Sequence, residues 1–315
     1  MPSSSRLLMG TGLRYFLEVV RCGSVSEASQ RLSVAGSAIS RQITRLEQEL
    51  DTVLFERHPR GMVPSAAGEL LAAHARRSQL DTERVADDIQ ALAGLRRGKV
   101  RLASSEGFAI DFLPGLIAAF REHYSGIQFD LHVNTAEQAT RRVLEGDADI
   151  ALTYSLAPRS GVHIAYRQSS PIHAIMAPDH PLADREQVSL AQMHPWPIAL
   201  PETTTTLRQL FDVCCSRRQL LFEPVFTSNF TEALTSFALL GQGLTLSGEL
   251  TVRRRLALGR LMAVPIRDPG MDARQIQIQT LAGRTLPRAV NTFLDFLRSA
   301  MEQPPGAVTL PTATA

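Results

Sequence analysis

The segment SVSEASQRLSVAGSAISRQITRLEQEL, residues 24–50, contains the clearest pattern in the chain. Ser24 to Glu27 match the S-x-x-E capping box that opens a helix. A short break at residues 33–36 separates this helix from a longer one. Apolar residues in the longer helix recur with gaps of four, three and four, which predicts a stripe packed against a core. The stripe consists of Ile39, Ile43, Leu46 and Leu50.

The other side of the longer helix is polar. It carries Ser37, Ser40, Arg41, Thr44, Arg45 and Gln48. Hydroxyl groups bond phosphates or base edges, and arginine suits guanine edges in the major groove. Two helices joined by a tight turn, the second with such a face, describe a helix-turn-helix. An ordinary solvated amphipathic helix is the alternative interpretation.

The next segment, LFERHPRGMVP at residues 54–64, has the pattern of a short hairpin, or wing. Arg57, His58 and Arg60 fall near its tip. Arginine on such a wing can enter a narrow minor groove, where the negative potential is enhanced. The wing favours the DNA-binding interpretation of the preceding helices.

Residues 66–94 have helical composition and high charge. Leu71, Val85 and Leu92 lie at multiples of seven, and Leu70 and Ile89 flank them. This is a partial heptad, interrupted by Ser78 and Asp88, so the pattern predicts a long helix but gives only weak support for a coiled coil. A single long surface helix is the alternative.

From Lys99 to about Pro304, strand and helix patterns alternate. Strands are predicted at 100–103, 127–133 and 148–152, and helices at 113–124 and 137–144. Such strand–helix–strand units imply a parallel sheet with helices on both faces. Sheets of this kind bind ligands outside the carboxyl ends of their strands.

The composition of the chain agrees with this organisation. At 315 residues the chain predicts about two domains, and its 44% hydrophobic and 20% charged residues are typical of globular proteins. The formal net charge is +2, and Lys99 is the only lysine, so arginine must supply most phosphate contacts. Neither a secretory signal nor an apolar run of bilayer length is visible, and three cysteines make no disulfide framework, which predicts a reduced, cytoplasmic protein without a metal site. Adjacent Cys214 and Cys215 are interpreted as buried small hydrophobes, with a redox switch as the alternative.

The stretch from Leu13 to Glu69 resembles the winged helix-turn-helix of LysR-type transcriptional regulators. The matching residues are Leu13-Arg14-Tyr15-Phe16, Gly23-Ser24-x-Ser26-x-Ala28, Ala38-Ile39-Ser40-Arg41-Gln42-Ile43-x-x-Leu46-Glu47, Leu54-Phe55-Glu56-Arg57, Arg60-Gly61 and Ala67-Gly68-Glu69. The resemblance continues through the rest of the chain apart from the tail. It implies a fold class of α/β with an N-terminal all-α winged helix-turn-helix, joined by a long linker helix to a two-lobed effector domain like a periplasmic binding protein.

The resemblance also implies a domain organisation. Residues 1–65 would form the DNA-binding domain, 66–95 the dimerisation helix, 96–303 the effector domain and 304–315 a disordered tail. Lobe one is placed at about 99–164 with 266–303, and lobe two at about 165–265. The implied partners are double-stranded promoter DNA, a small-molecule effector and a second copy in a homodimer or homotetramer. RNA polymerase is a candidate further partner, and no cofactor or membrane is expected.

The candidate DNA-binding residues combine the polar helix face, the wing and the first cap. They are Ser24, Ser37, Ser40, Arg41, Arg45, Arg57, Arg60 and Gly61. The family often begins the recognition helix with Ser or Thr, then Gln, then Pro, whereas this chain has Ala35-Gly36-Ser37. Ala35 has no side-chain oxygen for a cap and Gly36 has no side chain to read a base. An altered half-site preference is therefore expected.

The candidate effector-binding residues lie at strand ends. They are Ser104, Ser105, Thr135, Thr153, Tyr154, Thr203, Thr204, Asn229 and Phe230. The run Thr203 to Thr206 opens a predicted helix, whose free N–H groups and positive dipole end suit a carboxylate. Helix capping alone is the alternative role for these threonines. Phe108 and Phe230 are expected to form an apolar wall, which favours an aromatic or hydrophobic acid.

Three alternative functions fit the sequence less well. An enzyme lacks support because no Gly-x-Ser-x-Gly, His-Glu-x-x-His or phosphate-binding glycine loop appears. A ligand-binding module on a periplasmic-binding-like fold would explain the last two-thirds of the chain, but an exported one needs a signal peptide. A purely architectural DNA binder would not need a two-lobed domain. The sequence therefore favours a regulator whose promoter binding responds to a small organic acid.

Overall fold

The computed structural model describes residues 10–58, 61–91, 98–157 and 159–302. Contacts divide the chain into an N-terminal unit, Met1–Gly94 with Arg284–Arg288, and a C-terminal unit, Leu95–Gly283 with Ala289–Ala315. Arg60, Leu92 and the tail at 304–315 lie outside the described residues. Within the described part, every helix is too short or too polar to cross a bilayer.

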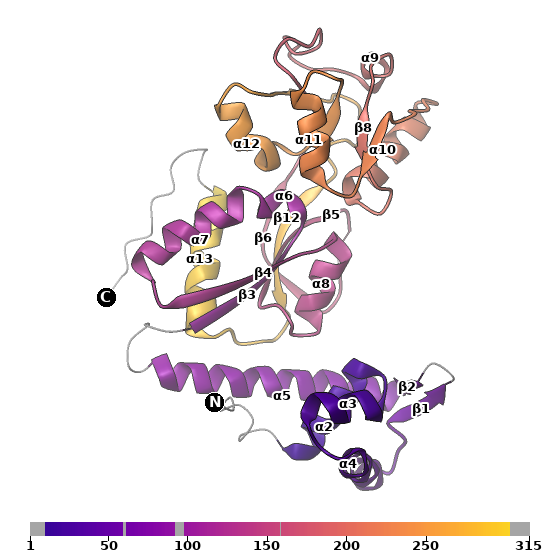
Figure 1. Ribbon diagram of the computed structural model, residues 1–315, viewed down its shortest axis with the longest axis vertical. Helices are drawn as coiled ribbons and strands as arrows, with labels where there is room; N and C mark the ends of the chain where they lie inside the picture. Colours follow the sequence, from indigo (N-terminus) through magenta and orange to yellow (C-terminus); the bar gives the residue numbers. More distant parts are fainter. Residues whose placement is uncertain (1–9, 59–60, 92–97, 158, 303–315) are drawn as a thin grey trace. The chain divides into compact units, whose positions relative to one another are not determined.

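The N-terminal unit is a helical bundle with a hairpin (Figure 1). Its elements are α2 (Thr11–Cys22), α3 (Val25–Leu32), α4 (Gly36–Leu50), β1 (Phe55–His58), β2 (Gly61–Pro64) and α5 (Ala66–Ala91). Phe16, Ile39 and Leu54 are fully buried in its core. The predicted helix-turn-helix, wing and long helix are therefore present. Leu50 departs from the predicted stripe, since it is 50% exposed at the end of α4, beyond the reach of the core.

The cap of α3 is half of the predicted box. The Ser24 Oγ accepts a hydrogen bond of 3.0 Å from the amide of Glu27, as expected of an N-cap serine. The Glu27 carboxylate instead accepts a 2.8 Å bond from Arg31 on the next turn. The cap holds the start of α3 at the turn after α2.

The wing is anchored to the same turn. β1 and β2 pair antiparallel, with Phe55 opposite Pro64 and His58 opposite Gly61. The Met62 amide donates a 2.7 Å hydrogen bond to the carbonyl of Gly23. Gly61 has φ +120°, and a Cβ there would lie 2.5 Å from the Gly23 carbonyl oxygen. Glycine is therefore required at residue 61 for the hairpin to reach the turn.

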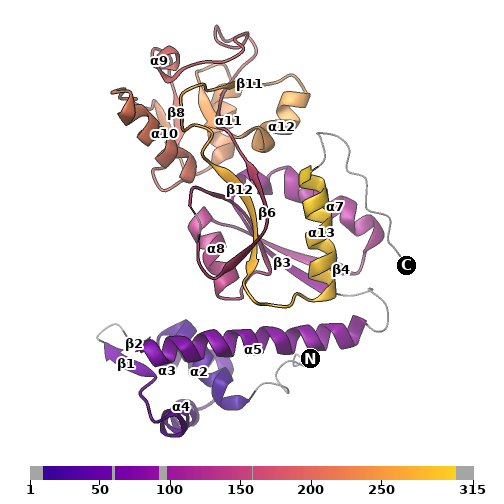
Figure 2. The same ribbon diagram turned by 180° about the vertical axis from the view of Figure 1, so that it is seen from behind.

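Lobe one of the C-terminal unit is a five-stranded sheet in the order β4-β3-β5-β12-β6. Its elements are β3 (Gly98–Ser104), α6 (Glu106–Ala109), α7 (Phe112–His123), β4 (Ile127–Val133), α8 (Ala136–Leu144), β5 (Ile150–Ser155), β6 (Val162–Ser169), β12 (Gln275–Leu281) and α13 (Arg288–Glu302). Figures 1 and 2 show α7 and α13 on one face and α8 on the other. Aromatic rings fill the first interface, where Phe293 packs 5.1 Å from Phe120 and 4.8 Å from Phe129. Small residues such as Ala103 and Ala139 fill the second.

Lobe two is built from shorter pieces. Its elements are β7 (His173–Met176), α9 (Leu190–Met193), β8 (Ala199–Pro201), α10 (Thr206–Arg217), β9 (Phe226–Ser228), α11 (Thr231–Leu239), β10 (Thr245–Ser247), α12 (Glu249–Ala257) and β11 (Met262–Pro265). The strands form a β10-β7-β11 sheet and a parallel β8-β9 pair. The Thr245 hydroxyl donates a 2.9 Å bond to the Ala199 carbonyl and so ties the two groups together. The ends of β8, β9 and β10 therefore meet near one another.

The sheet of lobe one differs in two ways from the sequence expectation. β3, β4 and β5 are parallel, but β12 runs antiparallel to both β5 and β6. The first segment of the sheet ends with β6 at Ser169, whereas lobe one was expected to end near residue 164. The chain returns to the sheet with β12 at Gln275, whereas lobe one was expected to resume near residue 266. These lobe boundaries depend on the pairing of β12 with β5 and β6, which lie more than 100 residues earlier in the chain. Such long-range pairing cannot be predicted from local periodicity.

Candidate DNA interface and ligand cavity

The outer face of α4 is the candidate DNA interface. Ile39 and Ile43 hold the helix against the core at 0% and 4% exposure. Ser37, Ser40 and Arg41 point the other way and are exposed. No described residue forms an ion pair or a side-chain hydrogen bond with Arg41, so its guanidinium is available to a duplex.

Arg45 on the same face has an internal partner. Its Nε lies 2.8 Å from the Glu49 carboxylate, one turn further along α4. Both side chains are more than half exposed, and exposed pairs of this kind contribute little to stability. A phosphate can therefore replace Glu49 at low cost.

The start of α4 lacks a side-chain cap, as expected because the N-cap residue, Ala35, has no side-chain oxygen. Gly36 is the first helical residue and faces Val25, with room for a Cβ at 3.5 Å. Neither position carries a polar side chain that could hydrogen-bond to a base edge. The altered half-site preference stays a prediction.

The remaining candidate DNA-binding residues of the N-terminal unit are Ser24, Gly61, Arg57 and Arg60, and the first two have structural roles. Ser24 serves as the α3 cap, and its hydroxyl hydrogen is not used in that bond. Gly61 provides the backbone turn of the wing. Arg57 is placed in β1 by its backbone, but its side chain and all of Arg60 lie outside the described residues.

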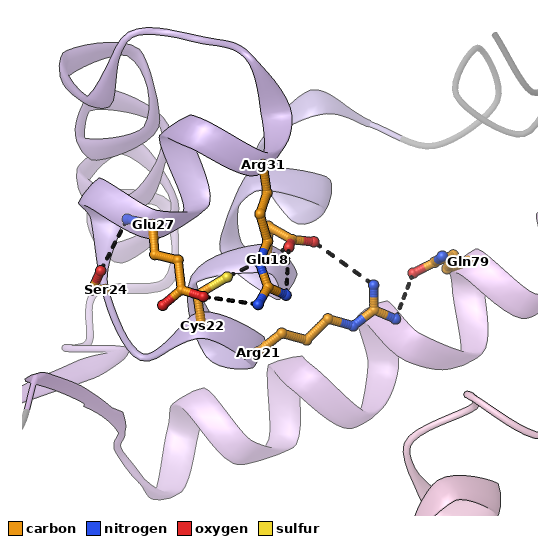
Figure 3. Close-up of polar contacts among 7 residues, drawn as sticks. All are labelled: Glu18, Arg21, Cys22, Ser24, Glu27, Arg31 and Gln79. Carbon is orange, nitrogen blue, oxygen red and sulfur yellow. Dashed lines mark hydrogen bonds and ion pairs between the residues drawn. The ribbon is translucent and has the colours of Figure 1, made fainter. Parts of the chain in front are cut away.

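A polar network that the sequence did not indicate joins α2, α3 and α5 (Figure 3). The Glu18 carboxylate lies 3.8 Å from both Arg21 and Arg31. Arg21 also donates a 3.4 Å hydrogen bond to Gln79 in the middle of α5. The network therefore connects the helix-turn-helix to the long helix within the N-terminal unit.

The C-terminal unit contains a cavity of about 640 Å³ between its lobes. Six of the nine predicted effector residues line it: Ser105, Thr135, Tyr154, Thr204, Asn229 and Phe230. Thr135 also forms a complete capping box with Gln138 at the start of α8. The ends of β3, β4, β5, β8 and β9 thus bring residues from both lobes around one space.

The other three predicted residues are not in the lining. Ser104 and Thr153 are buried at 0% and 1% exposure beneath it. Thr153 lies 3.0 Å from the Ser105 hydroxyl and so supports a lining residue from below. Thr203 is exposed, and Thr205 rather than Thr203 caps α10 by accepting the amide of Arg208.

The predicted aromatic wall is half correct. Phe230 lines the cavity and is 54% exposed. Phe108 is fully buried and stacks under the Tyr154 ring, with centroids 4.6 Å apart. Tyr154 therefore takes the place that Phe108 was expected to occupy.

Glu106 lines the cavity and was not predicted. Its carboxylate accepts hydrogen bonds from the Thr231 amide at 2.9 and 3.0 Å and from the Thr231 hydroxyl at 2.8 Å. Thr231 is the first residue of α11, which has no cap from its own segment. A lobe-one carboxylate thus caps a lobe-two helix, and both residues line the cavity.

Arg274 is the second lining residue that was missed. It is 2% exposed, and its guanidinium lies 4.0 Å from the centroid of the Tyr154 ring. Its Nε and Nη2 donate long bonds of 3.4 Å to the Ser170 carbonyl and hydroxyl. Burial lowers the pKa of Arg274 because removal from water disfavours the charged form.

The two adjacent cysteines are part of the lobe-two core. Cys214 and Cys215 are 2% and 5% exposed on α10. Burial raises the pKa of Cys215 to about 12, so the thiol stays protonated at neutral pH. Both side chains pack as small hydrophobes.

Two family models match the chain. The bacterial regulatory helix-turn-helix model of the lysR family covers residues 11–69, and the LysR substrate binding domain covers residues 93–302. The transcriptional dual regulator GltC of Bacillus subtilis is 29% identical over 289 residues, which are 90% of this chain and 95% of that protein.

Solved structures show the same fold. Full-length OxyR from Pseudomonas aeruginosa has a TM-score of 0.68 at 18% identity, covering 92% of this chain and 95% of that one. The effector binding domain of QuiR, solved in complex with shikimate, has a TM-score of 0.53 at 17% identity and covers 65% of this chain and 97% of that one.

Proposed function

The chain belongs to the LysR family of DNA-binding transcriptional regulators, and on that premise we propose that it binds promoter DNA under the control of a small organic acid held between its two lobes. The observation that carries this proposal is the pairing of two features on one polypeptide. One is a helix-turn-helix with an exposed polar face on α4. The other is a ligand-sized cavity lined from both lobes of the C-terminal unit.

For DNA binding, Ser37, Ser40 and Arg41 supply the major-groove contacts from α4. Their exposure and the burial of Ile39 on the opposite side support this assignment. Arg45 and Ser24 contact phosphates, and Arg57, Arg60 and Gly61 belong to the wing contact. Contacts to bases would read the DNA sequence, and contacts to phosphates would position the protein on the DNA backbone.

For effector binding, the residues are those that line the cavity from both lobes. The α10 N-terminus opens onto it through Thr204, Thr205 and Thr206, and its free amides favour an anionic group. The apolar part of the lining, which includes the rings of Phe230 and Tyr154, favours a ligand with a hydrophobic body. The QuiR domain in complex with shikimate supports a carboxylate in a site of this fold.

The linker helix α5 mediates assembly in this proposal. Its 26 residues carry exposed apolar side chains at Leu70, Val85 and Ile89, with exposures of 76%, 39% and 61%. Pairing of two α5 helices would cover them and provide the two-fold symmetry of a palindromic site. We place such a homodimer or homotetramer in the cytoplasm, where the promoter and RNA polymerase are.

The mechanism is a population shift. The effector binds the closed arrangement of the two lobes more tightly than the open one and so favours closure. Closure changes how the effector units pack in the oligomer, which alters the spacing of the DNA-binding units.

The test is selection of bound DNA fragments by the full-length protein, repeated with a panel of metabolites. Operator affinity and DNA bend are then measured with and without each metabolite that changes the selection. Sequence-specific binding that a carboxylic acid alters is expected. Absence of specific binding, or identical affinity and bend with every acid, would contradict the proposal.

A further inference from the structure

The cavity contains a buried positive charge that has no counter-ion among the described residues. Arg274 is 2% exposed, and the polar contacts of its guanidinium are the two 3.4 Å bonds to Ser170. The face of the Tyr154 ring offsets part of the charge. A buried guanidinium without a carboxylate is costly, so such groups are normally paired.

Two carboxylates line the same cavity, and neither is paired with Arg274. Glu106 has its oxygens committed to the amide and hydroxyl of Thr231. Glu202 is exposed at the start of the loop before α10. The protein thus leaves the arginine charge open toward the space where a ligand fits.

The backbone around the guanidinium is adapted to it. A Cβ at Gly248 would lie 2.7 Å from Arg274 Nη2 and 3.0 Å from the Ser170 hydroxyl. The Tyr154 hydroxyl is fixed by a 3.0 Å bond with Thr251, so the ring keeps its position against the guanidinium. Arg274 is therefore held in one orientation at the edge of the cavity.

We propose that Arg274 binds the carboxylate of the effector and that Glu106 restricts the effector to a single negative charge. The proposal rests on the proposed effector site and names the residues that select its ligand. Arginine offers a carboxylate two parallel hydrogen bonds as well as charge. A second carboxylate on the ligand would meet Glu106, which its three bonds to Thr231 hold in place.

The remaining lining defines the rest of the ligand. The same lining includes apolar side chains: Ile110, Leu207, Phe230, Leu234 and Leu246. The expected effector is a monocarboxylic acid with an apolar or partly hydroxylated body. A hydroxyl on that body can donate a further hydrogen bond to Glu106, because each carboxylate oxygen has two lone pairs.

The experiment measures thermal unfolding of the full-length protein at constant ionic strength with matched probes. Benzoate and shikimate are the monoanions, terephthalate is the dianion and benzamide is the neutral isostere of benzoate. At least one monoanion is expected to raise the Tm of the wild type, and benzamide is not. Arg274→Met and Arg274→Gln should lose that rise, and Arg274→Lys should keep part of it.

Two more variants make the test specific. Glu106→Gln keeps an acceptor for Thr231 and should respond to terephthalate more than the wild type does. Gly248→Ala keeps the arginine charge but displaces it, so it should also weaken the response, even if neither neutral variant of Arg274 folds. A ligand contact moves these responses, whereas a merely structural arginine would change only the Tm without probe.

Several outcomes would overturn the proposal. They are an equal benzoate response in Arg274→Met, an equal response to benzamide, no wild-type response to any of the carboxylates, or an unchanged terephthalate response in Glu106→Gln. Because the assay contains no DNA, these outcomes are separate from a failure of promoter binding. An equal response in Arg274→Met would assign the anion to the α10 N-terminus and leave the proposed regulator intact.

Discussion

Glu106 and Thr231 lie 125 residues apart in the sequence, line the cavity of the C-terminal unit from different lobes, and are joined by three hydrogen bonds. The acceptor is a carboxylate from lobe one, and the donors are the first amide and the hydroxyl of a lobe-two helix. Charge-assisted bonds at a helix N-terminus are among the stronger polar contacts in proteins. This contact therefore holds the two lobes together beside the ligand space.

The first prediction removes this contact. Glu106→Ala should lower the stability of the C-terminal unit by about 1–3 kcal/mol, because the Thr231 amide and hydroxyl lose a charged acceptor. Thermal unfolding of the full-length protein checks it. Glu202→Ala is the control, since Glu202 lines the same cavity but is exposed. Equal effects of the two substitutions would show that the bonds to Thr231 contribute nothing specific.

The second prediction concerns DNA recognition. Arg41→Ala should cost roughly 1–3 kcal/mol on the preferred site if the guanidinium contacts a base edge. Titration of labelled duplexes at fixed salt measures this loss. Arg121→Ala, an exposed arginine of α7 in the C-terminal unit, is the matched control. An equal loss on a random duplex would assign Arg41 to a phosphate instead.

Much of the N-terminal unit follows from local sequence. The four-residue gap between Ile39 and Ile43 predicts the buried face of α4, and both residues are buried. Leu50 continues the same spacing but is half exposed, because the periodicity of apolar residues does not indicate where the core ends. The same limit explains Val133, which continues the apolar alternation of β4 yet is 52% exposed and lines the cavity.

The candidate ligand site shows the corresponding limit for long-range contacts. Residues directly after parallel strands, such as Ser105 and Thr135, could be placed from strand ends alone. Arg274 could not, because it precedes an antiparallel strand whose pairing with β5 is not visible in any local pattern. Glu106 was missed for the same reason, since its partner belongs to the other lobe.

A third prediction tests the anchor of the wing. Gly61→Ala should destabilise the N-terminal unit by about 1–3 kcal/mol, because φ is +120° and the new Cβ would contact the Gly23 carbonyl. Denaturant unfolding and operator affinity should both decline. Gly115→Ala, inside α7, serves as the control, since nothing lies within 4 Å of a Cβ there. Unchanged unfolding and affinity in Gly61→Ala would mean that the hairpin is not held by this close approach.

The fourth prediction is a pH dependence of stability in the C-terminal unit. The pKa of His173 lies below its ordinary value of 6.5, first because burial disfavours the charged ring. The Pro171 carbonyl and Glu249 act in the opposite direction, and Arg274 lowers the pKa further. Burial lowers the pKa of His180 as well, against the opposing effect of Asp179.

Because these folded-state pKa values are depressed, the unfolded chain binds more protons as the pH falls below about 6.5. The stabilisation is complete above that pH and is lost as the pH drops toward the folded-state values. His173→Asn can still donate to the Pro171 carbonyl but does not titrate, so it should reduce the loss of Tm on acidification. His123→Asn, on the exposed surface of α7, is the matched control. A His173→Asn protein whose Tm falls with pH as steeply as that of the wild type would exclude His173 as a source of the acid sensitivity.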